Sequence, residues 1–533
     1  MRCSLFKLLI LFMLSGIFLN CARRGTPTGG PKDSIPPILV KAIPNIESIN
    51  FDETKIKIYF DEYVKLKEVK KKLVISPPQK YDPVITPLGT ASKFISIKIL
   101  DTLDPNTTYA FNFGNSIVDN NEENELENFK YVFSTGSYID SLKVSGEVTD
   151  LTVKKSAENI DVMLYEYDST FTDSVIYKEK PRYIANTLDS TLYELSNLRE
   201  GKYLLIALKD ANFNKIYNPE TDKIGFIKDT ITIPTDEKYN FTIFKEIPLF
   251  EAVRPKEANK GHIIFGFLGN AKGVNIELLS DAPSDFKSAI NFEKNKDTIN
   301  YWYTPFEADS LNFLVSKDDY SENFTVKTRS SDIDSLKTYK STNSVLHLID
   351  TFSIETNTPI VNIDKTLITL IDKDTLSVDF TTILSESKTK LYINFEKKHD
   401  QKYAFEMLPN SITDILGISN DTIAVDLITN TPEDYGTVNL NIVSSKKSSF
   451  IVDLLNDKEI IVRTSKVDKP QIVSFILVPP GKYFIRVTLD ENNNGIWDTG
   501  NFLNKRQPEL IKYFDTEIDL RANWEFNESI NLD

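Results

Sequence analysis

The chain has 533 residues, a formal net charge of −15 at pH 7 and 26% charged residues. This length predicts several domains rather than one, and an acidic chain without a basic stripe is not expected to bind nucleic acid. Phe and Tyr are frequent (33 and 23 residues) while Gly and Met are few (19 and 4), and this composition favours β-strands.

The first element in chain order is a short apolar segment at the N-terminus. Arg2 and Lys7 supply positive charge, and residues 8–19 are apolar with two weak breaks. The segment is short for a bilayer span and has the proportions of a secretory signal peptide, so residues 1–20 are expected to be removed. A membrane anchor and a signal peptide cut elsewhere are the alternatives.

Cys21 follows this segment directly, and the other cysteine of the chain, Cys3, lies inside it. The pattern Ile17-Phe18-Leu19-Asn20 before Cys21 resembles the loose lipoboxes of Bacteroidetes lipoproteins, although Asn20 replaces the small residue of a strict lipobox. The resemblance implies acylation of Cys21. The processed chain would then have no thiol left for an intrachain disulfide.

Arg23 and Arg24 follow the cysteine, where surface-displayed lipoproteins of that phylum usually carry acidic residues. By resemblance, these basic residues favour the periplasmic face of the outer membrane over the cell surface. Residues 21–37 are rich in Pro and Gly and predict an extended tether.

Alternating apolar residues dominate the rest of the chain. Ile56, Ile58 and Phe60 would share one face of a strand. Many short runs of this kind, separated by Pro, Asn, Asp and Gly, predict half-buried strands of β-sandwiches. A short basic helix is expected around Lys65–Lys72. The predicted fold class is therefore all-β, with tandem β-sandwich modules after the signal peptide.

Module 1, residues 38–137, resembles the bacterial Ig-like domain first described in surface-layer proteins. This resemblance implies a spacer or adhesive unit and not an enzyme. The segments that carry it are Pro36-Pro37, Ile56 to Phe60 with the following Asp61-Glu62, Leu103 to Tyr109, and Phe133 to Gly136.

An internal repeat predicts a second Ig-like module. Tyr109-Ala110-Phe111 is followed by the segment Asn115 to Asp119, and Tyr403-Ala404-Phe405 is followed by Asn410 to Asp414. The second copy has one extra residue in the gap. Module 4 is accordingly expected at residues 345–430.

A second repeat links two further modules. Gly201-Lys202-Tyr203 leads to Asp210 and Gly481-Lys482-Tyr483 leads to Asp490, with nine residues from glycine to aspartate in both copies. Each copy predicts a turn, a strand and then an Asp/Asn loop.

Module 2, residues 140–250, begins near Val144 to Val148 and resembles the transthyretin-like or carboxypeptidase-regulatory sandwich. Module 5, residues 434–533, resembles the same class. Module 3, residues 255–340, is expected to be a β module of unknown type.

The loop of module 5 is a candidate calcium site, because calcium prefers six to eight oxygen ligands and alternate Asp/Asn side chains can wrap it. The loop matches the first nine positions of an EF-hand-type loop, with Gly495 at the tight turn. Asn501 stands where that motif has a bidentate Glu, and a strand precedes the loop. The alternative is an Asx-turn loop bonded to its own backbone. The candidate ligands are Asp490, Asn492, Asn494, the carbonyl of Ile496, and Asp498.

The equivalent loop of module 2 is a weaker candidate, because Lys215 replaces the glycine and Asn218 replaces the second aspartate. Its remaining oxygen ligands would be Asp210, Asn212 and Asn214. Tyr217 and Trp497 occupy equivalent positions in the two copies and are interpreted as cover for the loops.

The sequence gives little support for further metal, partner or catalytic sites. The acidic run 122–127 is interpreted as a solvated loop, with a cation or partner site as the alternative. His262, His347 and His399 lack metal-ligand spacing. No nucleophile elbow or Gly-rich phosphate loop is visible, and paired carboxylates cannot be placed across a cleft from sequence.

These features predict a non-enzymatic, lipid-anchored scaffold or interaction subunit of the bacterial cell envelope. Its partners would be the membrane, through the lipid on Cys21, and another envelope protein. The alternative is a surface glycan-binding lipoprotein of a nutrient-uptake system, and a hydrolase is a remote third. Calcium is the one cofactor considered.

Overall fold

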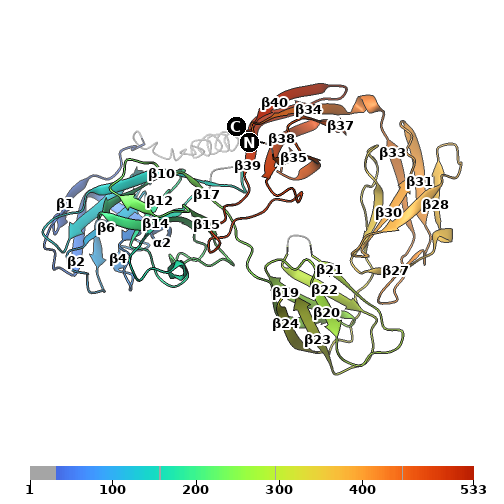
Figure 1. The fold of residues 1–533 in the computed structure, drawn as a ribbon, viewed down its shortest axis with the longest axis horizontal. Helices are drawn as coiled ribbons and strands as arrows, with labels where there is room; N and C mark the ends of the chain where they lie inside the picture. Colours follow the sequence, from blue (N-terminus) through green and yellow to red (C-terminus); the bar gives the residue numbers. More distant parts are fainter. Residues whose placement is uncertain (1–31, 155–157, 294–295, 447) are drawn as a thin grey trace, which may run out of the picture. The chain divides into compact units, whose positions relative to one another are not determined.

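The structure is a computed structural model that describes residues 32–154, 158–293, 296–446 and 448–533. The predicted signal peptide, Cys21 and the predicted tether up to residue 31 lie outside the described residues. The chain folds as two compact units, of which one ends at Ser141 and the other begins at Leu142. The predicted all-β fold of tandem β-sandwiches is confirmed (Figure 1).

Module 1 forms a sandwich because its strands alternate between core and solvent. Ile56 and Ile58 are fully buried, while Lys55 points outward. One sheet runs β4-β5-β2-β7-β8 with β1 on β2, and the other runs β3-β6-β9. The elements are β1 (Leu39–Ile43), β2 (Lys55–Leu66), α2 (Val69–Lys72), β3 (Val74–Ser76), β4 (Val84–Thr86), β5 (Ser92–Lys98), β6 (Thr108–Gly114), β7 (Ile117–Asp119), β8 (Glu125–Leu126) and β9 (Phe129–Ser134).

The short basic helix predicted at Lys65–Lys72 begins later than expected. Strand β2 continues to Leu66 because Lys65 still pairs with Val118 of β7. Only Val69–Lys72 is helical.

Modules 2 and 5 share one topology. In module 2, β10 lies between β13 and β17, and it pairs in parallel with β17. In module 5, β34 lies between β37 and β40, and it pairs in parallel with β40. The second sheet runs β12-β11-β14-β15, with β16 also on β14, in module 2, and β36-β35-β38-β39 in module 5. The repeat seen in the sequence therefore extends to the strand order of both sheets.

The elements of module 2 are β10 (Leu142–Asp150), β11 (Asp161–Glu166), η2 (Asp173–Tyr177), β12 (Tyr183–Asn186), β13 (Leu192–Leu198), β14 (Gly201–Lys209), β15 (Lys223–Phe226), β16 (Ile231–Ile233) and β17 (Phe241–Ile243). Those of module 5 are η4 (Pro432–Asp434), β34 (Gly436–Val443), β35 (Ser449–Asn456), β36 (Ile461–Val467), β37 (Ile472–Val478), β38 (Gly481–Asp490), β39 (Ile511–Leu520) and β40 (Glu525–Asn531).

Module 3 has sheets β18-β19-β22-β21 and β20-β23-β24. Its strands are β18 (Glu251–Asn259), β19 (His262–Leu268), β20 (Asn275–Leu278), β21 (Ser288–Phe292), β22 (Thr298–Tyr303), β23 (Ser310–Lys317) and β24 (Tyr320–Lys327).

Module 4 has sheets β25-β26-β30-β29, β28-β31-β33 and β27-β32. It begins earlier than the predicted residue 345, because Thr338–Lys340, expected in module 3, pairs with β26 of module 4. Its elements are β25 (Thr338–Lys340), β26 (Phe352–Thr356), β27 (Ile360–Ile363), η3 (Lys365–Leu367), β28 (Ile368–Asp372), β29 (Phe380–Leu384), β30 (Lys390–Phe395), β31 (Gln401–Met407), β32 (Ile412–Asp414) and β33 (Ile423–Thr429).

Within the described residues, each module has a hydrophobic cluster of its own. The repeated segments of modules 1 and 4 occupy the same environment. Ile117 and Ile412 are fully buried, and Asp119 and Asp414 are each 1% exposed. In both modules the hydroxyl of the repeated tyrosine, Tyr109 or Tyr403, accepts a backbone N–H from five residues earlier.

Candidate functional site

The Asp/Asn loop of module 5 leaves the end of β38 at Asp490. The Tyr483 hydroxyl donates to the Pro479 carbonyl at 2.7 Å and fixes the start of this strand. In module 2, the Tyr203 hydroxyl donates to the Arg199 carbonyl at 3.0 Å. The strands that lead into the two loops are therefore fixed at their start by the same type of tyrosine hydrogen bond.

The carboxylate of Asp490 is bonded by the loop that follows it. Its Oδ1 accepts the N–H of Asn494 at 3.0 Å, and its Oδ2 accepts the N–H of Gly495 at 2.8 Å. Gly495 has φ +76°, which L side chains rarely adopt. Asp490 is 3% exposed, so these bonds close the loop over a buried carboxylate.

The amides of the loop converge on Asp498. The side-chain N–H groups of Asn492 and Asn494 each donate to Asp498 Oδ2 at 2.6 Å. Asn494 Oδ1 accepts the N–H of Ile496 at 2.8 Å. The structure thus brings together the side chains predicted as calcium ligands, in an Asx-turn network of the kind expected for the alternative reading.

Throughout the part of the chain that the structure describes, no group of three or more His, Cys, Asp or Glu residues is placed to hold a metal ion. The oxygens of Asp490 and Asn494 accept backbone N–H groups, and Asp498 accepts amide N–H groups. Calcium binding would have to exchange several of these bonds for metal ligands. It stays a prediction.

Sequence reasoning missed Glu509, which closes this loop from the far side. Glu509 Oε1 accepts the N–H of Glu491 at 2.8 Å, and Oε2 accepts the N–H of Asp498 at 3.0 Å. The indole N–H of Trp497 donates to the Glu509 carbonyl at 2.9 Å. Burial, together with the charges of Asp498 and Asp490, raises the pKa of Glu509.

Asp222 has the same role in module 2. Its Oδ1 accepts the N–H of Ala211 at 3.0 Å, and its Oδ2 accepts the N–H of Asn218 at 2.8 Å. Ala211 and Asn218 correspond to Glu491 and Asp498, counted from Asp210 and Asp490. The two copies thus share a carboxylate clamp that joins the first and eighth residues after the aspartate.

The clamp was hidden because its spacing differs between the copies. Asp222 follows Asp210 by 12 residues, whereas Glu509 follows Asp490 by 19. The usable signal is an acidic residue placed just before the strand that follows each loop.

The module 2 loop carries a cation of its own. Lys215 Nζ lies 2.5 Å from Asp161 Oδ2, and the side-chain N–H of Asn186 donates to Asp161 Oδ1 at 2.8 Å. Asp161 is 2% exposed. Lys215, which stands where the module 5 loop has Gly495, is thus paired with Asp161, and calcium at Asp210, Asn212, Asn214 and Asn218 stays a prediction.

The three histidines are not brought together. The ring of His262 stacks on Trp302 at 3.7 Å, and its Nε2 lies 2.8 Å from Asn300 Oδ1. Burial lowers the pKa of His262. His347 Nδ1 lies 3.1 Å from the Tyr435 hydroxyl, and His399 is exposed. These contacts are those of packing side chains.

The acidic run after Asp119 is tied to its own module. The Asp119 carboxylate accepts the backbone N–H groups of residues 121–124 at 2.8–3.1 Å. Burial opposes its ionisation, but these four bonds together lower the pKa of Asp119. Glu123 pairs with Lys67 at 2.9 Å. The prediction of a solvated loop fits Glu123 and Glu127, which are exposed, but Glu122 and Glu125 are half-buried, and the prediction misses the buried Asp119 that shapes the loop.

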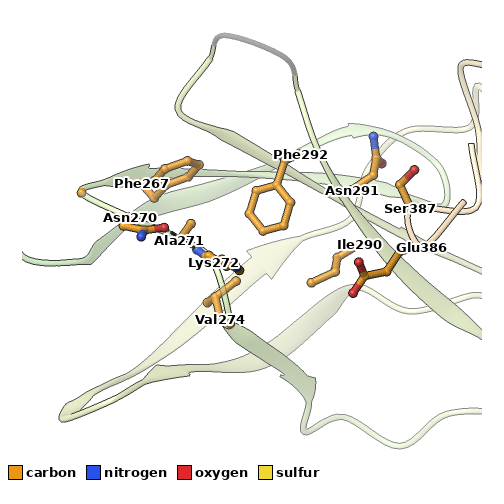
Figure 2. Close-up of a pocket in the computed structure, with 12 residues that line it drawn as sticks. Phe267, Asn270, Ala271, Lys272, Val274, Ile290, Asn291, Phe292, Glu386 and Ser387 are labelled. Carbon is orange, nitrogen blue, oxygen red and sulfur yellow. Dashed lines mark hydrogen bonds between the residues drawn. The ribbon is translucent and has the colours of Figure 1, made fainter. Parts of the chain in front are cut away.

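An open cleft of ≈ 630 Å³ is lined by module 3 and by Glu386 and Ser387 of module 4 (Figure 2). In Figure 2 the ring of Phe292 lies between the loop that carries Asn270 and Lys272 and the side formed by Ile290 and Glu386. Phe292 is 46% exposed. An exposed ring beside amide and charged groups is a chemistry that can bind sugars or short polar chains.

One outer sheet face of module 1 is basic and aromatic. Lys41 Nζ lies 5.1 Å from the centre of the Tyr59 ring, and Lys57 Nζ lies 5.3 Å from that of Phe94. The two rings lie 5.5 Å apart. Strand alternation and pairing add two more lysines to this face. The lysine face comprises Lys41, Lys55, Lys57, Tyr59, Phe94 and Lys98.

Comparison with known proteins supports the sandwich architecture. Residues 33–135 match the family described as bacterial Ig-like domain. This match confirms the Ig-like resemblance of module 1. No curated protein sequence matches the chain.

Several solved structures are similar at low identity. The surface-layer protein SbsC, domains 1–6, is 11% identical, with 92% of this chain and 68% of that chain covered and a TM-score of 0.16. The major pilin subunit BcpA of Bacillus cereus is 12% identical, with 73% and 99% covered and a TM-score of 0.14. The Bacillus anthracis TIE protein is 11% identical, with 95% and 76% covered and a TM-score of 0.14.

Among the described residues, no helix has the length and apolar character needed to cross a membrane.

Proposed function

We propose that this protein is a non-enzymatic, lipid-anchored scaffold or interaction subunit of the bacterial cell envelope. The observation that carries the proposal is the succession of sandwich modules, each with its own hydrophobic cluster, of which the first is a bacterial Ig-like domain. Such an array extends a chain and offers loops and sheet faces to partners. Acyl chains on Cys21 would hold it at the outer membrane, on the periplasmic face.

The lysine face supports a position of module 1 near a membrane surface. The chain as a whole is acidic, so anionic headgroups would repel most of it and attract this face. Each lysine near an anionic surface contributes about 1 kcal/mol. Leu39 lies 18 positions after Cys21, a reach of at most about 65 Å when the chain is extended. An anchor at Cys21 would thus keep the lysine face within reach of the headgroups.

The loops that first suggested chemistry support a structural role. The buried carboxylates Asp490, Glu509, Asp210 and Asp222 accept backbone N–H groups of their own loops. His262 packs on Trp302 and bonds Asn300. These groups are engaged in holding turns and strands together, which is the role expected in a scaffold.

Two measurements test the proposal. Protease shaving of intact cells is expected to spare the protein, and solubilisation in mild detergent followed by affinity capture is expected to retain an envelope protein. Degradation on intact cells would overturn the periplasmic location. Capture of no protein by the parent chain, under conditions that retain known envelope complexes, would overturn the scaffold role.

A second candidate function is glycan binding at the cell surface, and the cleft beside Phe292 is the observation that favours it. Stacking of a sugar on the exposed ring of Phe292 would be lost in Phe292→Ala. Glycan-array binding by the parent chain that this variant abolishes, together with cleavage on intact cells, would favour this function over the scaffold.

A further inference from the structure

The two copies of the Asp/Asn loop differ by one insertion. In module 2, three residues separate Asn218 from the clamp residue Asp222. In module 5, the insertion loop, residues 499–508, separates Asp498 from the clamp residue Glu509. Paired backbone hydrogen bonds of 2.8 and 3.0 Å between Asn501 and Arg506 close this loop on itself. The extra residues therefore form a shaped projection, held at its base by the clamp.

The polar groups of the insertion loop bond module 2. The Thr499 hydroxyl donates to the Lys245 carbonyl at 2.5 Å, and the Gln507 side-chain N–H donates to the Phe226 carbonyl at 2.9 Å. The backbone N–H of Phe502 donates to the Glu246 carboxylate. Lys505 Nζ lies 2.7 Å from Asp173 Oδ1. These four contacts join residues more than two hundred positions apart in the sequence.

An apolar contact accompanies these bonds. The Phe502 side chain is 0% exposed, and its ring lies 5.3 Å from the Phe226 ring in an edge-to-face arrangement of 88°. Gly500 packs directly on Phe244: a Cβ at this position would lie 2.5 Å from Phe244 Cζ. A buried aromatic anchor together with several polar contacts is the usual composition of a specific interface.

Strands of module 5 add contacts beside the insertion loop. The Tyr513 hydroxyl donates to the Thr152 carbonyl at 3.0 Å. Lys154 Nζ lies 3.6 Å from the centre of the Phe484 ring. The sheet β36-β35-β38-β39 thus extends the contact that the insertion loop makes with module 2.

We propose that the insertion loop is an intramolecular docking element whose partner is module 2 of the same chain. It fixes module 5 to module 2, so that modules 3 and 4 are held at both ends instead of one. The Asp/Asn loop then acts as the support of this element: Asp490 and Glu509 set the backbone from which residues 499–508 project. This inference stands independently of the lipid anchor.

Spin-label distances in the otherwise intact mature chain, with Cys21→Ser, test the docking. Leu192 and Ile472 are 65% and 67% exposed, and cysteines there report on modules 2 and 5. The parent is expected to give one narrow distance peak. Phe502→Ala and Gly500→Ala are each expected to lose it. Ile496→Ala, in the same loop outside the insertion and 60% exposed, is the matched control and keeps the peak.

A charge swap guards against variants that merely unfold module 5. Lys505→Glu is expected to broaden the peak, and Asp173→Lys in the same chain is expected to narrow it again. A broad peak in the parent, or an unchanged peak in both Phe502→Ala and Gly500→Ala, would overturn the proposal. So would a peak that arises from a mixture of singly labelled chains, since the partner would then be module 2 of a second copy.

Discussion

Replacement of Glu509 by Ala removes the clamp of the module 5 loop while leaving the backbone donors in place. Two N–H groups, from Glu491 and Asp498, lose a carboxylate that accepts them at 2.8 and 3.0 Å. Hydrogen bonds to charged groups contribute about 1.5–3 kcal/mol each. Burial and the neighbouring aspartates raise the pKa of Glu509, so part of this stabilisation is offset by holding the ionised form. The net loss is expected to be about 2–4 kcal/mol.

Amide hydrogen exchange measures this loss locally, without assuming two-state unfolding of a multi-module chain. Peptides that cover residues 491–498 are expected to exchange roughly 30- to 900-fold faster in Glu509→Ala than in the parent. Glu491→Ala, which keeps its backbone N–H, is the control and leaves exchange near the parental rate. Asp222→Ala should act likewise on residues 211–218. Acceleration in Glu509→Ala no greater than in the control would refute the clamp.

Three further outcomes are expected. Lys215→Ala leaves the buried Asp161 carboxylate without its 2.5 Å ammonium partner and should lower the free energy of unfolding, measured by urea titration, by about 3–5 kcal/mol. Lys143→Ala, which breaks the exposed ion pair with Glu194, is the control and should cost at most about 1 kcal/mol. Equal losses in the two variants would contradict this prediction. The folded-state pKa of Asp119 is lowered, so its stabilisation is present above the unfolded value of 3.8 and is lost as pH falls through the folded-state pKa. Asp119→Asn should flatten this acid dependence of the urea midpoint. If the midpoint of Asp119→Asn depends on pH as the parental midpoint does, this role of Asp119 is contradicted. Calcium should raise the melting temperature, and Asp490→Ala should abolish the rise; a melting temperature insensitive to excess chelator would show that the loop needs no ion.

Local patterns were predictable from the sequence because strand alternation is a short-range property. Ile56, Ile58 and Phe60 alternate in the chain and are buried in the sandwich. The repeats also carried over: Ile117 and Ile412 are both fully buried, in equivalent short strands. Such a prediction holds because the repeated segments have similar sequences and therefore adopt the same local structure.

Long-range features were not predictable in the same way. The parallel pairing of β34 with β40 joins the first and last strands of module 5, and strand alternation carries no information about such partners. Glu509 was missed because the insertion moved it away from the spacing of Asp222. The burial of Phe502 depends on Phe226, far away in the chain, and no local signal distinguishes it from a loop residue.

The lipid anchor is the claim on which the proposed function depends most directly. Cells grown with an alkyne-bearing fatty acid are expected to label the parent protein, and the label should disappear in Cys21→Ser, which is released from the membrane fraction. Absence of label in the parent, or its persistence in Cys21→Ser, would contradict anchoring through Cys21.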